Sequence, residues 1–129
     1  MTMATLSEAP RKANVLFDRA KANPSGYLDV DPANVARVVG KVRLVDVREP
    51  HELVGELGHV AGVENVPLSD LEAAARTWDK EQEVVLVCRS GGRSGRAAAL
   101  LVSVGFARVM NLAGGMLGWN EANLPTANV

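Results

Sequence analysis

Apolar and polar residues along this chain alternate between two kinds of segment. Four short apolar runs have the length and β-branched content of strands, over residues 42–47, 63–66, 83–87 and 109–112. Helical segments lie between and after them, over residues 50–57, 69–76, 94–104 and about 116–122. The run EVVLV is apolar on both faces, which is typical of a strand covered by helices on each side. This alternation predicts an α/β fold with a central, mainly parallel sheet and helices on both faces.

The first third of the chain predicts two further helices. Apolar residues with helical spacing, beginning at Ala13, predict a helix over residues 10–23 that Pro24 ends. Asp31 is a good N-cap residue, and Pro32 after it suits the first helical position. This pair predicts a second short helix over residues 31–39.

Length and composition indicate one ordered globular domain. The chain has 129 residues, 47% of them hydrophobic and 22% charged, with a net charge of -1. We divide it into an N-terminal extension with a helix, residues 1–26, and a single domain, residues 27–129. The charge balance argues against binding to nucleic acid or to an anionic membrane. No apolar run approaches the roughly 18 residues of a membrane span, and the N-terminus lacks a signal-peptide core, so we expect a cytoplasmic protein.

Cys88 is the single cysteine of the chain, which excludes an internal disulfide. The chain has two histidines and no second cysteine to complete a zinc site, so we expect no metal and no cofactor. A lone cysteine after an apolar strand is either a packed core residue or a reactive thiol. The residues that follow Cys88 decide between these two interpretations.

The segment after Cys88 has the pattern of an anion-binding loop. A buried strand ends at residue 87, and a helix is predicted from Ser94. Five residues connect them: Arg89, Ser90, Gly91, Gly92 and Arg93. The two glycines allow the loop to curl so that backbone N–H groups point inward, and the helix adds its positive N-terminal end. Together with Arg96 in the helix, three arginines surround the thiol. We therefore expect the Cys88 pKa to lie below the ordinary value of about 8.5, and we expect an anionic substrate.

Several motifs of the chain, in order, resemble those of single-domain rhodaneses, a family of sulfurtransferases. CRSGGRS, residues 88–94, resembles the active-site loop, and DVRE, residues 46–49, resembles a family strand end. GHVAGV, residues 58–63, resembles a Gly-His-Ile-Pro-Gly-Ala turn, with Ala61 and Val63 as mild departures. LAGG, residues 112–115, with Trp119 resembles the closing motif. The likeness extends from about residue 31 to residue 125.

The resemblance implies a rhodanese-like fold and a thiosulfate sulfurtransferase. In such an enzyme the Cys88 thiolate takes a sulfur atom from thiosulfate or a similar small anionic donor and holds it as a persulfide. A thiol or cyanide acceptor, or a sulfur-accepting protein, then removes that sulfur. Sulfite leaves as a stable anion, so the reaction requires no general acid.

The resemblance also implies roles for the residues around Cys88. The substrate-binding residues are Arg89, Ser90, Gly91, Gly92, Arg93 and Ser94, whose backbone N–H groups hold the persulfide charge. Arg89 and Arg93 bind the anionic end of the donor, and Arg96 lies on the helix surface or steers anions. Asp46 and Arg48 either support the site or form a salt bridge that braces the loops. Trp119 either borders the pocket or packs in the core.

Three other functions compete with this one. Related phosphatases and arsenate reductases have five residues between Cys and Arg, whereas Arg93 is the fifth residue after Cys88 and Ser94 the sixth. A docking module without catalysis typically loses the cysteine, which this chain keeps. A persulfide relay, which passes sulfur between proteins, uses the same chemistry and is compatible with this sequence.

Overall fold

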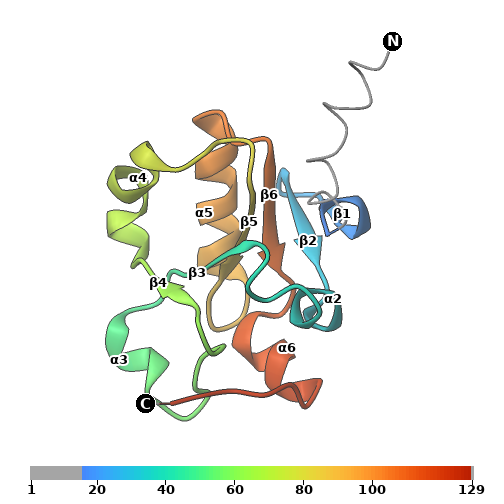
Figure 1. Ribbon diagram of the computed structural model, residues 1–129, viewed down its shortest axis with the longest axis vertical. Helices are drawn as coiled ribbons and strands as arrows, with labels where there is room; N and C mark the ends of the chain where they lie inside the picture. The colour runs from blue at the N-terminus through green and yellow to red at the C-terminus, as the bar shows by residue number, and fades with distance from the viewer. Residues whose placement is uncertain (1–15, 129) are drawn as a thin grey trace.

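A computed structural model of the protein describes residues 16–128. Six strands form one sheet in the order β1-β2-β6-β5-β3-β4. The strands are β1 (Lys21–Asn23), β2 (Tyr27–Val30), β3 (Arg43–Asp46), β4 (Glu64–Asn65), β5 (Glu83–Val87) and β6 (Arg108–Leu112). The β1–β2 pair is antiparallel and every other neighbouring pair is parallel (Figure 1). The expected α/β fold with a mainly parallel sheet is confirmed.

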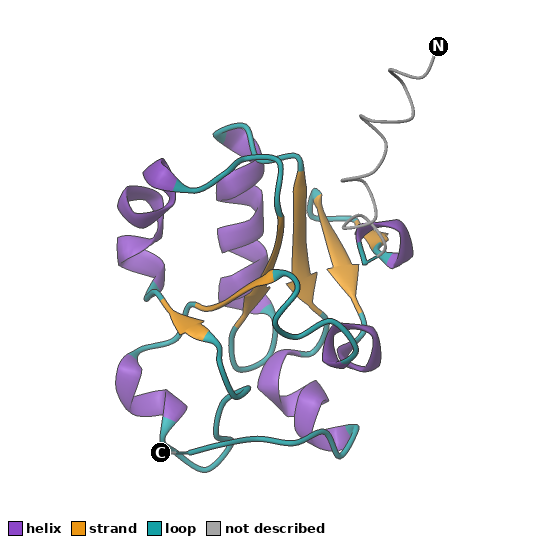
Figure 2. Ribbon diagram, in the orientation of Figure 1, coloured by secondary structure: helices purple, strands orange, loops and turns teal. Residues whose placement is uncertain are grey.

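Helices cover both faces of this sheet (Figure 2). The α-helices are α2 (Pro32–Ala36), α3 (Pro50–Leu53), α4 (Leu71–Ala74), α5 (Gly92–Ser103) and α6 (Gly115–Glu121). Short 3-10 turns are η2 (Phe17–Arg19), η3 (Leu68–Asp70) and η4 (Ala75–Thr77). On one face α4 and α5 pack through residues such as Leu71 and Leu101, and on the other α2 and α6 pack through Val35 and Trp119. Strand β5 lies between these two cores, which explains why all five of its residues are buried.

The predicted N-terminal helix is wrong over the residues that the structure describes. Residues 10–15 lie outside the described part, Phe17–Arg19 forms a 3-10 turn, and Lys21–Asn23 is an edge strand. The chain then reverses through Gly26, whose φ is +97°, and Asn23 pairs with Tyr27. The apolar spacing that suggested a helix does mark buried contacts, because Leu16 is 2% exposed and packs on the sheet.

The remaining predicted elements occur close to their expected positions, although most are shorter. The helix expected over residues 31–39 is α2, and the one expected over residues 50–57 is α3. The segment 69–76 is not one continuous helix but divides into η3, α4 and η4. No helix among residues 16–128 is long and apolar enough to cross a membrane.

The carboxyl ends of the parallel strands meet at one end of the sheet, where α3, α6 and the loop after β5 gather (Figure 1). Open α/β folds bind their ligands at this end. Cys88, Arg48 and Gly114 all follow strand ends there.

Candidate active site

Cys88 follows the last residue of β5 and has no exposed surface. Its sulfur accepts a hydrogen bond from the backbone N–H of Gly91, with an N–Sγ distance of 3.0 Å. The Ser94 hydroxyl lies 3.3 Å from the same sulfur. Backbone N–H groups of Ser90 and Ser94 also favour negative charge on this sulfur. The structure therefore surrounds this sulfur with hydrogen-bond donors, an arrangement that suits an anion.

Of the two glycines in the loop, only Gly91 needs the conformational freedom of glycine, because Gly92 is helical and a Cβ atom there would meet no other atom within 4 Å. Gly91 adopts a φ of +105°, a left-handed backbone conformation that residues with a side chain rarely adopt. Gly91 is also the N-cap residue of α5. Helix α5 begins at Gly92, two residues before the expected start, so Arg93 and Ser94 belong to its first turn. The positive end of a twelve-residue helix thus points toward the loop that holds the thiol.

Helix α6 fixes the loop from the other side. The backbone N–H of Met116 donates to the Cys88 carbonyl at 2.8 Å, and that of Leu117 donates to the Arg89 carbonyl at 3.0 Å. A Cβ atom on Gly115 would lie 2.5 Å from the Cys88 carbonyl oxygen, so only glycine permits this approach. The closing Gly114-Gly115 motif therefore brings α6 against the Cys88 loop.

These contacts lower the pKa of the Cys88 thiol. Burial is the largest single influence and raises the pKa, because it removes the thiolate from water. Four interactions lower the pKa and together outweigh the effect of burial. They come from the Ser94 hydroxyl and from the backbone N–H groups of Ser94, Gly91 and Ser90. The direction agrees with the expectation from sequence, but the cause is the ring of hydrogen bonds more than the three arginines.

Arg93 is occupied by an ion pair that the sequence did not reveal. Its two terminal nitrogens each donate to a Glu52 carboxylate oxygen at 2.9 Å. This pairing lowers the pKa of Glu52 from 4.5 to about 2 and raises that of Arg93. Glu52 also accepts from the backbone N–H of Glu49, which completes a capping box at the start of α3. The charge of Arg93 is therefore largely balanced at the edge of the site.

Arg89 and Arg96 both have exposed side chains. Arg89 borders a cavity of about 220 Å³, together with Arg48, Glu52 and residues of the turn after α3. Among residues 16–128, no carboxylate lies within salt-bridge distance of Arg89. Arg96 lies on the outer surface of α5, as one of the two expectations stated.

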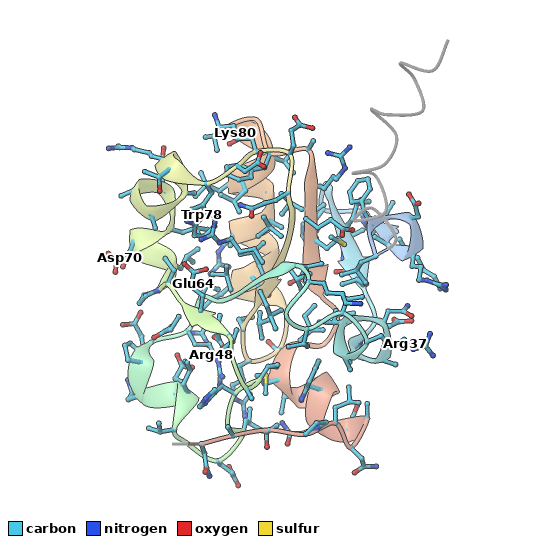
Figure 3. The ribbon with its side chains drawn as sticks, in the orientation of Figure 1. Arg37, Arg48, Glu64, Asp70, Trp78 and Lys80 are labelled. Atoms are coloured by element: carbon cyan, nitrogen blue, oxygen red, sulfur yellow. The ribbon has the colours of Figure 1, made fainter. Side chains whose placement is uncertain are left out.

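Asp46 and Arg48 form a buried ion pair, with 2.8 Å between the Arg48 terminal nitrogen and an Asp46 carboxylate oxygen. Arg48 also donates to the carbonyls of Gly58 and Glu52, at 2.8 Å and 3.3 Å. Figure 3 shows its side chain between β4 and α3. These contacts tie the end of β3 to the turn after α3, which is the bracing role that the sequence left open.

Trp119 lies in the core on the α2 and α6 face, and Cys88 belongs to the core on the opposite face. Trp119 is 1% exposed, and its indole N–H donates to the Pro125 carbonyl at 2.9 Å. The structure thus places Trp119 in packing, apart from the thiol.

Two residues near the site were missed from the sequence, Glu52 and Asn111. Asn111 is 3% exposed, and its amide oxygen accepts a hydrogen bond from Ser94. An asparagine in the otherwise apolar run VMNL, residues 109–112, was a signal that the sequence offered. Glu52 gave a weaker one, since its spacing from Glu49 predicts only a helix cap.

Comparison with known proteins identifies the family. The family model of the rhodanese-like domain matches residues 31–122. An uncharacterized protein of Synechocystis sp. is 44% identical over 85 residues, which cover 66% of this chain and 46% of that protein. This chain therefore spans about half the length of that curated relative. A sulfurtransferase of Allochromatium vinosum is 37% identical over 84 residues, covering 65% of this chain and 77% of that protein.

A solved structure agrees with the sequence comparisons. The crystal structure of a rhodanese-related protein from Thermoplasma volcanium superposes with a TM-score of 0.70 at 26% identity. The match covers 78% of this chain and 98% of that one. With a thiol held at the carboxyl end of β5 in a ring of N–H donors, the chain belongs to the rhodanese-like domain family, whose members include sulfurtransferases.

Proposed function

We propose that this protein is a sulfurtransferase that moves sulfur from thiosulfate, or a similar small anionic donor, to a thiol or cyanide acceptor. The observation that carries the proposal is the environment of Cys88. Its sulfur receives a hydrogen bond from the Gly91 backbone N–H, and the Ser94 hydroxyl lies 3.3 Å away. The backbone N–H groups of Ser90 and Ser94 at the start of α5 also favour negative charge on the sulfur. Such a ring stabilises negative charge on sulfur, which both the thiolate and the persulfide carry.

The proposed reaction has two steps. The Cys88 thiolate attacks the outer sulfur of thiosulfate, the S–S bond of the donor breaks, and sulfite leaves with the electron pair. The outer sulfur of the resulting persulfide is then attacked by a thiolate or by cyanide. The Cys88 thiolate leaves, and the acceptor departs as a persulfide or as thiocyanate. No proton needs to move to the leaving group in either step.

The loop residues have distinct roles in this proposal. The N–H groups of Ser90, Gly91 and Ser94 hold the charged sulfur in both steps. Arg89 attracts the sulfite end of the donor, because its charge has no balancing carboxylate within residues 16–128. Because the thiol has no exposed surface, a donor reaches the sulfur only when neighbouring side chains move aside.

Steady-state kinetics with thiosulfate and cyanide test this function. We expect parallel double-reciprocal lines, as in a ping-pong mechanism, and thiocyanate as the product. The Cys88→Ser variant should show no turnover, and Arg96→Ala is the control that keeps it. Turnover by Cys88→Ser would contradict the proposal. Absence of turnover with every small acceptor, while Cys88 still becomes a persulfide, would instead indicate the relay to a partner protein.

A further inference from the structure

A chain of polar side chains leads from Cys88 to the edge of the sheet. The Ser94 hydroxyl contacts both the Cys88 sulfur and the amide oxygen of Asn111 on β6. The Asn111 amide nitrogen donates to an Asp29 carboxylate oxygen on β2 at 2.9 Å. The other Asp29 oxygen accepts from the Asn23 side chain, also at 2.9 Å. Ser94 is fully buried and Asn111 is nearly so.

The hydrogen-bond directions along this chain are fixed from its outer end. The backbone N–H of Ser25 donates to the Asn23 amide oxygen, so the Asn23 amide nitrogen faces Asp29. A carboxylate only accepts, so the Asn111 amide nitrogen must also face Asp29. The Asn111 amide oxygen is therefore directed at Ser94, where it needs a donor.

Ser94 has one hydroxyl proton and two acceptors that compete for it. When Cys88 is a thiol, its S–H donates to the Ser94 oxygen and the Ser94 proton goes to Asn111. When Cys88 is a thiolate, the sulfur needs the Ser94 proton, and donating it leaves the buried Asn111 oxygen without a partner. An unpaired buried acceptor is unfavourable, so Asn111 opposes ionisation of Cys88.

We propose that Asn111 and Asp29 are positioning residues that direct the Ser94 hydroxyl away from the Cys88 sulfur. In this way they limit how strongly that hydroxyl stabilises the thiolate. This inference rests on the role proposed above for Cys88. The consequence is a balance between two needs of the site. A thiolate that is stabilised too strongly is a weaker nucleophile and a better leaving group. The Asn111–Asp29 pair moderates the stabilisation that the backbone N–H groups supply.

Charged groups in the segments packed around Cys88 come from the loop itself, which carries Arg89, and from three further elements. Arg93 in α5 interacts electrostatically with both Cys88 and Asp46, and Asp46 at the end of β3 is paired with Arg48. Helix α6 contributes one ionisable side chain in its range, Glu121, which is exposed. None of these groups contacts Asn111, so changes at Asn111 leave their charges in place.

The test is a double-mutant cycle read out on the acidity of Cys88. Since Cys88 is the single cysteine, its rate of alkylation by iodoacetamide against pH reports it alone, without any sulfur-transfer activity. Asn111→Leu keeps the side-chain size and removes the competing acceptor. We expect the Cys88 pKa to fall by about half a unit to one unit, the amount that corresponds to one hydrogen bond. In a Ser94→Ala background, Asn111→Leu should leave the Cys88 pKa unchanged.

Asp29→Asn provides a second variant that retains the packing of Asn111. An asparagine at position 29 accepts from Asn23 and presents its amide nitrogen to Asn111, so Asn111 turns and donates to Ser94. The Ser94 proton is then free for the sulfur, and the Cys88 pKa should again fall. Asn65→Leu, which removes an asparagine that bonds backbone carbonyls beside β4, is the matched control and should leave the Cys88 pKa unchanged.

The measurements overturn the inference in either of two ways. A Cys88 pKa that rises or stays the same in Asn111→Leu shows that Asn111 does not compete for the proton. A fall of equal size with and without Ser94 shows that the effect does not pass through that hydroxyl. If Asn111→Leu fails to fold, Asp29→Asn with and without Ser94→Ala decides by the same criteria. Failure of sulfur transfer itself would leave these pKa values readable, so the two proposals fail separately.

Discussion

Replacing Glu52 by Gln removes the charge that balances Arg93, and the structure gives the size of the effect. Each terminal nitrogen of Arg93 donates to a Glu52 oxygen at 2.9 Å. The lowering of the Glu52 pKa from 4.5 to about 2 corresponds to about 3 kcal/mol of folding free energy. The two side chains are 22% and 34% exposed, and solvent screening reduces this to about 1–2 kcal/mol. We expect Glu52→Gln to lower the free energy of unfolding by that amount at pH 7.

The pH dependence identifies the cause of this loss. A carboxyl group with a lowered pKa in the folded state stabilises the fold above its unfolded pKa of 4.5. That stabilisation disappears as the pH falls from 4.5 toward 2, because in this range the unfolded chain binds a proton at Glu52 and the folded protein does not. Urea unfolding of the parent protein and of Glu52→Gln should therefore show a constant difference above pH 4.5 that vanishes near pH 2.

Glu81→Gln is the matched control for this experiment. Glu81 also pairs with an arginine, Arg108, at 2.9 Å, but its side chain is 74% exposed. Exposed ion pairs contribute little, so its substitution should change stability much less. A difference between the parent and Glu52→Gln that persists unchanged at pH 2, or that is absent at pH 7, would refute the assignment.

The remaining predictions concern the loop. Arg93→Ala leaves the Glu52 carboxylate unpaired at the edge of the site, where it repels an anionic donor, so KM for thiosulfate should rise about tenfold or more. Adding Glu52→Gln should recover part of the loss. Arg89→Ala should also raise KM strongly, whereas Arg96→Ala should have a small effect that salt removes; equal, salt-insensitive losses would contradict these roles. Inserting one glycine between Gly92 and Arg93 displaces Ser94 from the sulfur, and activity should fall at least about tenfold. A folded insertion variant with full activity would show that loop length does not select the chemistry.

Local sequence pattern was sufficient for the centre of the molecule. The apolar run before Cys88 and the glycines after it predicted β5, the loop and α5, because each depends on neighbouring residues. The edge of the sheet was not predictable in this way. Strand β1 is only three residues long and mostly exposed, and it becomes a strand by pairing with β2. The helical spacing of apolar residues in this segment was therefore misleading, because the pairing of β1 with β2 determines its conformation.

In the site, too, features set by neighbouring residues could be predicted, and features set by tertiary contacts could not. The N–H donors around Cys88 follow from glycine and helix positions within seven residues of sequence. The Arg93–Glu52 pair joins residues 41 apart, and the Ser94–Asn111 contact joins residues 17 apart. Neither contact can be predicted from neighbouring residues, because the order of the strands in the sheet determines which strand ends lie side by side. The role of Asp29 was even harder to predict, because β2, the strand that carries it, was itself not predicted.

The central claim is that Cys88 carries the transferred sulfur, and intact-protein mass spectrometry tests it most directly. After incubation with thiosulfate, the protein should gain the mass of one sulfur atom, about 32 Da, at its single thiol. Cyanide should remove this mass and yield one equivalent of thiocyanate, and Cys88→Ser should gain no mass. A protein that consumes thiosulfate while Cys88 stays unmodified, or a Cys88→Ser variant that gains the same mass, would contradict the claim.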